Sequence, residues 1–155
     1  MAVINISLPT LAATKRLGVF LANILRAGDV IALNGPLGAG KSELARAIIA
    51  DQNPDELDIP SPTFTLVQTY EMADGTPLLH FDMYRLDAPE EARELGVEDA
   101  FYDGVSIVEW PDRIGGYLPS NALHCTLAIL PDGGREMTIE ASPQWQARLD
   151  GITQL

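Results

Sequence analysis

An octapeptide at residues 35–42, Gly-Pro-Leu-Gly-Ala-Gly-Lys-Ser, constrains this chain more than any other feature of its sequence. It matches the pattern G-x-x-x-x-G-K-[ST], in which a glycine-rich turn aims backbone N–H groups at phosphate oxygens. Glycine permits the tight turn because it tolerates positive φ angles, and the N-terminus of a following helix favours negative charge. The octapeptide therefore predicts a phosphate-binding loop between a strand and a helix.

The sequence on both sides of the octapeptide is suited to that setting. Residues 29–34 form a short β-branched apolar run typical of a buried strand, and residues 43–50 are rich in helix formers. In such a loop Lys41 reaches the β- and γ-phosphates of a nucleotide, and the Ser42 hydroxyl is a ligand of Mg²⁺. The loop residues expected to complete the nucleotide contacts are Gly35, Leu37, Gly38, Ala39 and Gly40.

The whole chain of 155 residues predicts one domain, residues 1–155, of the α/β class. Strands are expected at residues 3–8, 29–34, 64–70, 78–85, 105–109, 123–130 and 136–141. Helices are expected from a cap at Thr10 to Gly28, and at residues 43–50, 89–95 and 143–149. Turn residues at 74–75 and 131–134 indicate two hairpins. We expect a P-loop NTPase-like fold: a mixed, mostly parallel central sheet with added β-hairpins and flanking helices.

Composition narrows the classes of partner. The formal net charge is −12, from 10 basic and 22 acidic side chains, so strong direct binding to nucleic acid is not expected. The single cysteine, Cys125, excludes an intramolecular disulfide and is expected in the core. The first residues lack the pattern of a signal peptide, and no apolar run is long enough to cross a membrane. We therefore expect a cytoplasmic protein with no membrane partner.

A carboxylate ends one of the expected buried strands. Residues 105–109, Val-Ser-Ile-Val-Glu, place Glu109 where P-loop proteins commonly put an acid that holds Mg²⁺ or orients the attacking water. An unpaired carboxylate at the end of a central strand is costly, which favours a metal or another charged partner. The alternative is an ordinary exposed acid at the end of a strand.

Strict alternation puts three polar side chains on one face of the strand at residues 78–85. His80, Asp82 and Tyr84 share that face, which is either a solvated edge or part of a site. Beside a phosphate loop, Asp82 becomes a candidate for activating water or coordinating Mg²⁺.

The segment before this strand carries hydroxyl groups. Residues 53–62 predict a mobile surface loop, and the Ser61-Pro62-Thr63 sequence that follows opens a strand. Thr63 is either a contact of the γ-phosphate, as in switch segments, or part of ordinary turn chemistry. Three arginines are candidates for contact with nucleotide or for surface ion pairing: Arg85, Arg113 and Arg135.

Five motifs, in this order along the chain, carry a family resemblance. They are residues 35–42, 61–66 (SPTFTL), 80–86 (HFDMYRL), 94–98 (ELGVE) and 108–113 (VEWPDR). Together they resemble the bacterial TsaE (YjeE) family, the ATPase of tRNA threonylcarbamoyladenosine biosynthesis, over roughly residues 8–140. The phosphate loop alone indicates only an NTPase, whereas its combination with H-x-D-x-Y-R-L and V-E-W-P is specific.

The resemblance implies a function. Such proteins bind ATP and Mg²⁺, hydrolyse ATP slowly alone, and act with TsaD and TsaB to install threonylcarbamoyl on adenosine 37 of tRNAs that read ANN codons. The tRNA is then reached only through the complex, and the ATPase cycle resets the TsaD–TsaB complex between turnovers.

The resemblance also implies roles for particular residues. Those that match are Lys41 and Ser42 (phosphate and Mg²⁺), Glu109 (second Mg²⁺ ligand), Asp82 (needed for activity), Thr63 (switch threonine), and Thr14 and Arg135 (nucleotide contacts). Family loops often read Gly-Asp-Leu-Gly-Ala-Gly-Lys-Thr, whereas this chain has Pro36 and Ser42. Serine keeps the hydroxyl that Mg²⁺ requires, and Pro36 removes one backbone donor.

Three functions remain to be compared. The first is an ATPase accelerated by its partners, in which Lys41, Asp82 and Glu109 are catalytic and either carboxylate orients the water. The second is a nucleotide-gated binding module in which residues 53–65 become ordered on ATP and hydrolysis is incidental. The third is a small-molecule P-loop kinase, which would need an acceptor pocket.

Overall fold

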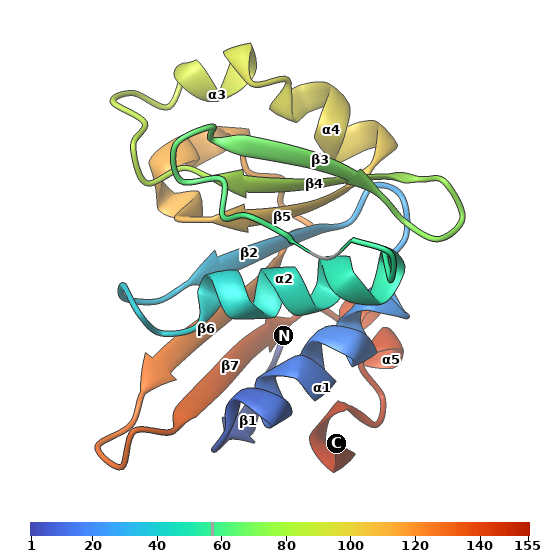
Figure 1. Ribbon diagram of the computed structural model, residues 1–155, viewed down its shortest axis with the longest axis vertical. Coiled ribbons are helices and arrows are strands. Elements are labelled where there is room, and N and C mark those ends of the chain that lie inside the picture. Colours follow the sequence, from blue (N-terminus) through green and yellow to red (C-terminus); the bar gives the residue numbers. More distant parts are fainter. Residues whose placement is uncertain (57) are drawn as a thin grey trace.

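The computed structural model describes residues 1–56 and 58–155, which form a seven-stranded sheet with helices on both of its faces (Figure 1). Leu57, within the segment predicted to be a mobile surface loop, lies outside the described residues. The strands are β1 (Ala2–Leu8), β2 (Val30–Asn34), β3 (Val67–Glu71), β4 (Pro77–Asp82), β5 (Val105–Glu109), β6 (Leu123–Ile129) and β7 (Arg135–Ala141). The helices are α1 (Leu11–Ala22), α2 (Lys41–Gln52), α3 (Glu91–Glu94), α4 (Val97–Asp103) and α5 (Pro143–Arg148), with 3₁₀ turns η1 (Pro111–Tyr117) and η2 (Ile152–Gln154).

The strand order is β1-β7-β6-β2-β5-β4-β3. The central strands β6, β2, β5 and β4 pair in parallel, whereas β3 pairs antiparallel with β4, and β7 pairs antiparallel with both β6 and β1. This confirms the predicted α/β class, the mixed sheet and both hairpins. Because parallel strands run the same way, the carboxyl ends of β2, β4 and β5 meet at one edge of the sheet.

Each face of the sheet packs against its own layer. The layer with α1, α2 and α5 buries side chains such as Leu17, Ile48 and Trp145 against one face (Figure 1). On the other face, α3, α4 and η1 bury side chains such as Phe101 and Ile114. All five residues of β5 are buried, because helices cover both of its faces.

Several boundaries differ from the prediction for local reasons. Thr10 does cap α1, accepting from the Ala13 N–H at 3.2 Å, but the helix ends at Ala22 and not near Gly28. The Asn23 amide donates to the Val19 carbonyl at 2.7 Å, a side-chain bond that competes with continuation of the helix.

The hairpin and the segment before β5 also differ. Strand β3 begins at Val67, because Leu66 has a φ of 69° and its N–H closes a turn on the Pro62 carbonyl at 2.6 Å. Helix α4 was not predicted, although its buried Val97, Ala100 and Phe101 have helical spacing. None of the helices in the described ranges is both long and apolar enough to cross a membrane.

Candidate functional site

The loop at residues 35–40 leaves the end of β2 and leads directly into α2. Gly35, Gly38 and Gly40 have φ angles of 146°, 80° and 105°, which other residue types rarely adopt. A Cβ atom at Gly35 would also lie 2.6 Å from the Leu127 carbonyl oxygen. The backbone therefore has the strand–loop–helix course that the octapeptide predicts, with the first turn of α2 facing the loop.

A cleft of about 440 Å³ opens beside this loop. It is lined by Pro36, Leu37, Gly38, Ala39, Gly40, Lys41, Ser42, Glu43, Arg46, Thr63, Asp82, Tyr84, Arg85, Glu109 and Trp110. Thus the fold brings the neighbouring residues Lys41 and Ser42 together with Thr63, Asp82 and Glu109, which lie far from them in the sequence. The pairing of β4 with β5 places Asp82 beside Glu109, each at the end of its strand.

Ser42 and Glu109 are in direct contact. The Ser42 hydroxyl donates to the Glu109 carboxylate, with Oγ 3.0 Å from Oε1 and 3.2 Å from Oε2. Glu109 is only 3 % exposed, so it is not the exposed strand-end acid that was the alternative prediction. Mg²⁺ takes oxygen ligands and is usually held by one or two carboxylates together with substrate phosphates. A hydroxyl and a carboxylate oxygen in a cleft beside the phosphate loop fit that ion.

His80 makes the second contact of Glu109. Its Nε2 lies 2.6 Å from Glu109 Oε2, the side chain is fully buried, and Nδ1 has no hydrogen-bond partner among the described residues. Strand β4 lies between β3 and β5, so the solvated-edge interpretation is wrong. His80 pairs with Ile107, which makes Glu109 its diagonal neighbour on the same face. The sequence could not reveal this contact, because it depends on the order of the strands.

The Lys41 ammonium group contacts the backbone of the phosphate loop. Its ammonium group donates to the Gly35 carbonyl and, at 3.2 Å, to the Pro36 carbonyl, and it lies 3.8 Å from the centroid of the Trp110 ring. Burial lowers the pKa of Lys41 below its ordinary value, whereas the carboxylates of Glu109 and Asp82 oppose that shift. The cation is thus held at the phosphate loop by dipoles and an aromatic face.

Trp110 lines the cleft, as Glu43 and Arg46 do, and none of these three was predicted from the sequence as a site residue. It has a φ of 58°, an unusual value for a bulky side chain, and its ring stacks near Tyr84 with centroids 4.9 Å apart. The sequence feature that could have identified Trp110 is its position directly after a strand-end acid and before a proline.

Asp82 connects the cleft to the predicted switch segment. Its Oδ2 accepts from the Thr63 hydroxyl at 3.0 Å, and its Oδ1 accepts from the Tyr84 N–H at 3.0 Å. The Thr63 hydroxyl is also 3.0 Å from that of Ser61. Tyr84 lies beyond the end of β4, so only two of the three predicted polar side chains, His80 and Asp82, lie on that face within the strand.

The two remaining predicted nucleotide contacts lie on the other side of the loop. Arg135 donates from Nε to the Ala39 carbonyl at 3.2 Å and from Nη2 to the Gly38 carbonyl at 3.1 Å. Thr14 is buried at the same place, and a hollow of about 210 Å³ joins both residues to the phosphate loop. The fold therefore places Thr14 and Arg135 beside residues 38–40.

The other two arginines stack on aromatic rings. The Arg85 guanidinium lies 4.5 Å from the Phe64 centroid and lines the cleft, and that of Arg113 lies 5.5 Å from the Tyr84 centroid. Stacking of this kind is attractive but weak at exposed positions, so it restrains both guanidinium groups only weakly.

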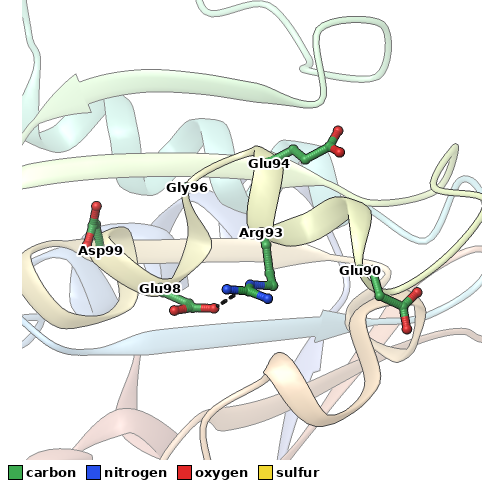
Figure 2. A pocket seen from close by; sticks show the side chains of 6 residues that line it. All are labelled: Glu90, Arg93, Glu94, Gly96, Glu98 and Asp99. Atoms are coloured by element: carbon green, nitrogen blue, oxygen red, sulfur yellow. Dashed lines mark ion pairs between the residues drawn. The ribbon is translucent and has the colours of Figure 1, made fainter.

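A further hollow, of about 460 Å³, lies between α3 and α4 (Figure 2). Arg93 pairs with Glu98 at 3.0 Å across the turn at Gly96, and Glu90 and Glu94 point away from that pair. Both partners of the pair are largely solvent-exposed. The site residues predicted from the sequence lie elsewhere, so this hollow is separate from the cleft.

Comparison with known proteins gives a consistent result. The model of a family described as "Threonylcarbamoyl adenosine biosynthesis protein TsaE" matches residues 8–137. The "tRNA threonylcarbamoyladenosine biosynthesis protein TsaE" of Rickettsia felis is 36 % identical over 88 % of this chain and 87 % of its own length. One from Bacillus subtilis is 35 % identical, over 83 % of this chain and 79 % of its own. The crystal structure of Bacillus subtilis YdiB superimposes with a TM-score of 0.78 at 26 % identity, covering 99 % of this chain and 95 % of that one.

Proposed function

The chain belongs to the TsaE family of tRNA threonylcarbamoyladenosine biosynthesis, and we propose that it is the magnesium-dependent ATPase of that process, acting with TsaD and TsaB. The observation that carries the proposal is the contact between Ser42 and Glu109 beside the phosphate loop. A hydroxyl and a buried carboxylate at this position are suited to a divalent cation bound to nucleotide phosphates.

Different groups of the chain bind the phosphates and the metal ion. The backbone N–H groups of the loop and the Lys41 ammonium bind the β- and γ-phosphates, for which Lys41 exchanges the Gly35 and Pro36 carbonyls for phosphate oxygens. Ser42 and Glu109 hold Mg²⁺, which when bound neutralises charge on the phosphates.

The remaining groups act on water and on the other end of the nucleotide. Either Asp82 or Glu109 orients the attacking water, since both carboxylates line the cleft. Thr14 and Arg135 contact the nucleotide from the far side of the loop, where the smaller hollow lies.

The partners supply what this chain lacks. With a net charge of −12, the chain is a poor ligand for tRNA, so TsaD and TsaB hold the tRNA in this proposal. The proposal includes slow hydrolysis by the chain alone and acceleration by the partners, because a partner could complete the charge around the γ-phosphate.

Phosphate release from MgATP, by the purified chain alone and with TsaD plus TsaB, tests the proposal. We expect stimulation by the partners that is lost in Lys41→Ala and kept in Lys15→Ala. Lys15 is a matched control because the sequence has only these two lysines and Lys15 is exposed. Absence of MgATP binding would refute the ATPase proposal, and phosphate transfer to an acceptor would favour the kinase.

A nucleotide-gated binding module is the second candidate. Both carboxylate oxygens of Asp82 accept hydrogen bonds, one of them from the Thr63 hydroxyl. The residue after Thr63, Phe64, is 81 % exposed, and this arrangement favours the module. A ligand that displaced Thr63 from Asp82 would move this exposed aromatic ring. If Asp82→Ala binds ATP and still supports repeated rounds of tRNA modification, the module is favoured over the ATPase.

A further inference from the structure

We propose that His80 is a positioning residue that holds the Glu109 carboxylate toward Ser42 and thereby sets the affinity of the cleft for magnesium-bound nucleotide. The inference rests on the proposed function, because it concerns the metal side of that same cleft. His80 is not among the residues that line the cleft, so it acts on bound nucleotide through Glu109.

The contact between the two residues is short and shielded from water. Nε2 of His80 lies 2.6 Å from Oε2 of Glu109, and the two side chains are 0 % and 3 % exposed. Hydrogen bonds to carboxylates are among the stronger ones in proteins, and low local polarity strengthens them further. Glu109 is thus fixed through one oxygen by a side chain that does not line the cleft.

Ser42 cannot fix the carboxylate by itself. Its hydroxyl has a single proton, yet it lies at nearly equal distances, 3.0 and 3.2 Å, from Oε1 and Oε2. The same hydroxyl must turn its oxygen toward a metal when nucleotide binds, and it then makes a different set of contacts. His80 is the donor that remains, because its side chain is fully buried and does not line the cleft.

The unpartnered nitrogen argues against a purely structural role. His80 Nδ1 is buried without a hydrogen-bond partner among the described residues, and such a group costs free energy of folding that an apolar side chain of similar size does not. Its neighbours on this face, Leu78 and Ile107, are apolar and fully buried. A histidine here is therefore unfavourable for packing and useful for the N–H that it offers to Glu109.

Calorimetric titration of the full-length chain with ADP, once with Mg²⁺ and once with EDTA, separates the metal effect from phosphate binding. The variants are His80→Met, which removes the donor, and His80→Gln, whose amide nitrogen can occupy a place similar to Nε2. We expect His80→Met to weaken MgADP binding about 10-fold or more, as for other groups that orient metal ligands, and to leave metal-free ADP binding unchanged. We expect His80→Gln to restore most of the loss.

Two controls make the result specific. His80→Asn carries the same amide on a shorter side chain that does not reach Glu109, so it should resemble His80→Met. In a Glu109→Gln background, His80→Met should cause no further loss, because a residue that acts only through Glu109 has nothing left to orient.

The outcomes are distinct. If wild-type protein shows no magnesium-dependent gain in ADP affinity, the proposed function fails. If the wild type shows the gain and His80→Met keeps it, or if metal-free binding falls equally, the role of His80 is refuted and the proposed function stands. Failure of His80→Gln to exceed His80→Asn, with both folded by circular dichroism, also refutes it.

Discussion

Two buried carboxylates lie at opposite ends of the parallel strands, and the protein satisfies them in different ways. Asp29, just before β2, meets the Arg148 guanidinium through both of its oxygens and accepts from the Arg26 N–H at 2.8 Å. Within the described part of the chain, the carboxylate of Glu109, at the end of β5, meets only a hydroxyl and an imidazole by hydrogen bonding. A guanidinium is a permanent cation that neutralises its partner, whereas the contacts of Glu109 leave it able to take an exchangeable cation. The ion pair between Asp29 and Arg148 therefore has a structural role, and we call it the lock at Asp29. The surroundings of Glu109 are instead suited to a ligand.

The lock at Asp29 joins distant parts of the chain. Arg148 comes from α5, 119 residues away in the sequence, and stacks 4.2 Å from the Trp145 centroid while it also donates to the Ile24 carbonyl. It thereby fixes the C-terminal helix to the turn that precedes β2. The site at Glu109 lies at the other edge, where such a permanent lock would block access.

The largest expected effect is on activity at Glu109. Glu109→Gln should reduce magnesium-dependent phosphate release about 100-fold or more, the usual range for loss of a group that stabilises charge in the transition state. Its stability in urea should be unchanged or slightly higher, because a buried charge has been removed. If activity persists while stability falls, Glu109 is a structural acid like Asp29, and the contrast between the two carboxylates is wrong.

Asp82 sharpens the comparison, since its donors among the residues that the structure describes are also uncharged, namely the Thr63 hydroxyl and the Tyr84 N–H. Asp82→Asn should lower phosphate release by roughly 100-fold, in the range for loss of a general base, and should preserve MgADP affinity. Calorimetry and phosphate release on the same preparation measure both. A loss of MgADP binding equal to that in Glu109→Gln would instead make Asp82 part of the metal site.

At the opposite end, the expected effect is on stability alone. Arg148→Met should destabilise the fold by about 2–3 kcal/mol, less than for a fully buried pair because the Arg148 side chain is 17 % exposed. Urea denaturation measures the change. Arg26→Met is the matched control, since Arg26 is exposed and contributes only its backbone N–H to Asp29.

The double variant Asp29→Asn with Arg148→Met completes this test. It should recover most of the lost stability, because the charge left without a partner is removed as well. If Arg148→Met is as stable as wild type, Asp29 needs no cation, and the contrast with Glu109 disappears.

The smallest expected effect concerns a buried thiol. Cys125 lies in the core beside Leu33, and burial raises the pKa of its thiol from 9.0 to about 12. The thiol ionises near pH 9 in the unfolded chain but stays protonated in the folded one, so its contribution to stability is lost as pH rises from 9 toward 12. Between pH 8 and 10 wild type should lose about 1 kcal/mol more than Cys125→Ala in urea denaturation. Equal losses would show that the thiol ionises freely in the folded protein.

Much of the fold was predictable, because its signals are local. The phosphate loop, the turn at residues 74–75, the cap at Thr10 and the strand at residues 105–109 all depend on neighbouring residues, and all are found. The predicted end of α1 and the predicted start of β3 were wrong. Asn23 redirects the chain through a side-chain hydrogen bond and Leu66 through a positive φ angle, and hydrophobic spacing reveals neither.

By itself, the sequence determined which residue types form the site and where the loop would turn, because glycine, lysine and serine at fixed spacing act within one loop. Only the tertiary structure decided their partners. Ser42 meets Glu109 across 67 residues and His80 meets it across 29, since β5 lies between β2 and β4 in the sheet. In the same way, the packing of α5 decided that Asp29 would meet Arg148. The partner of a buried charge depends on strand order and helix packing, and these are properties of the whole fold.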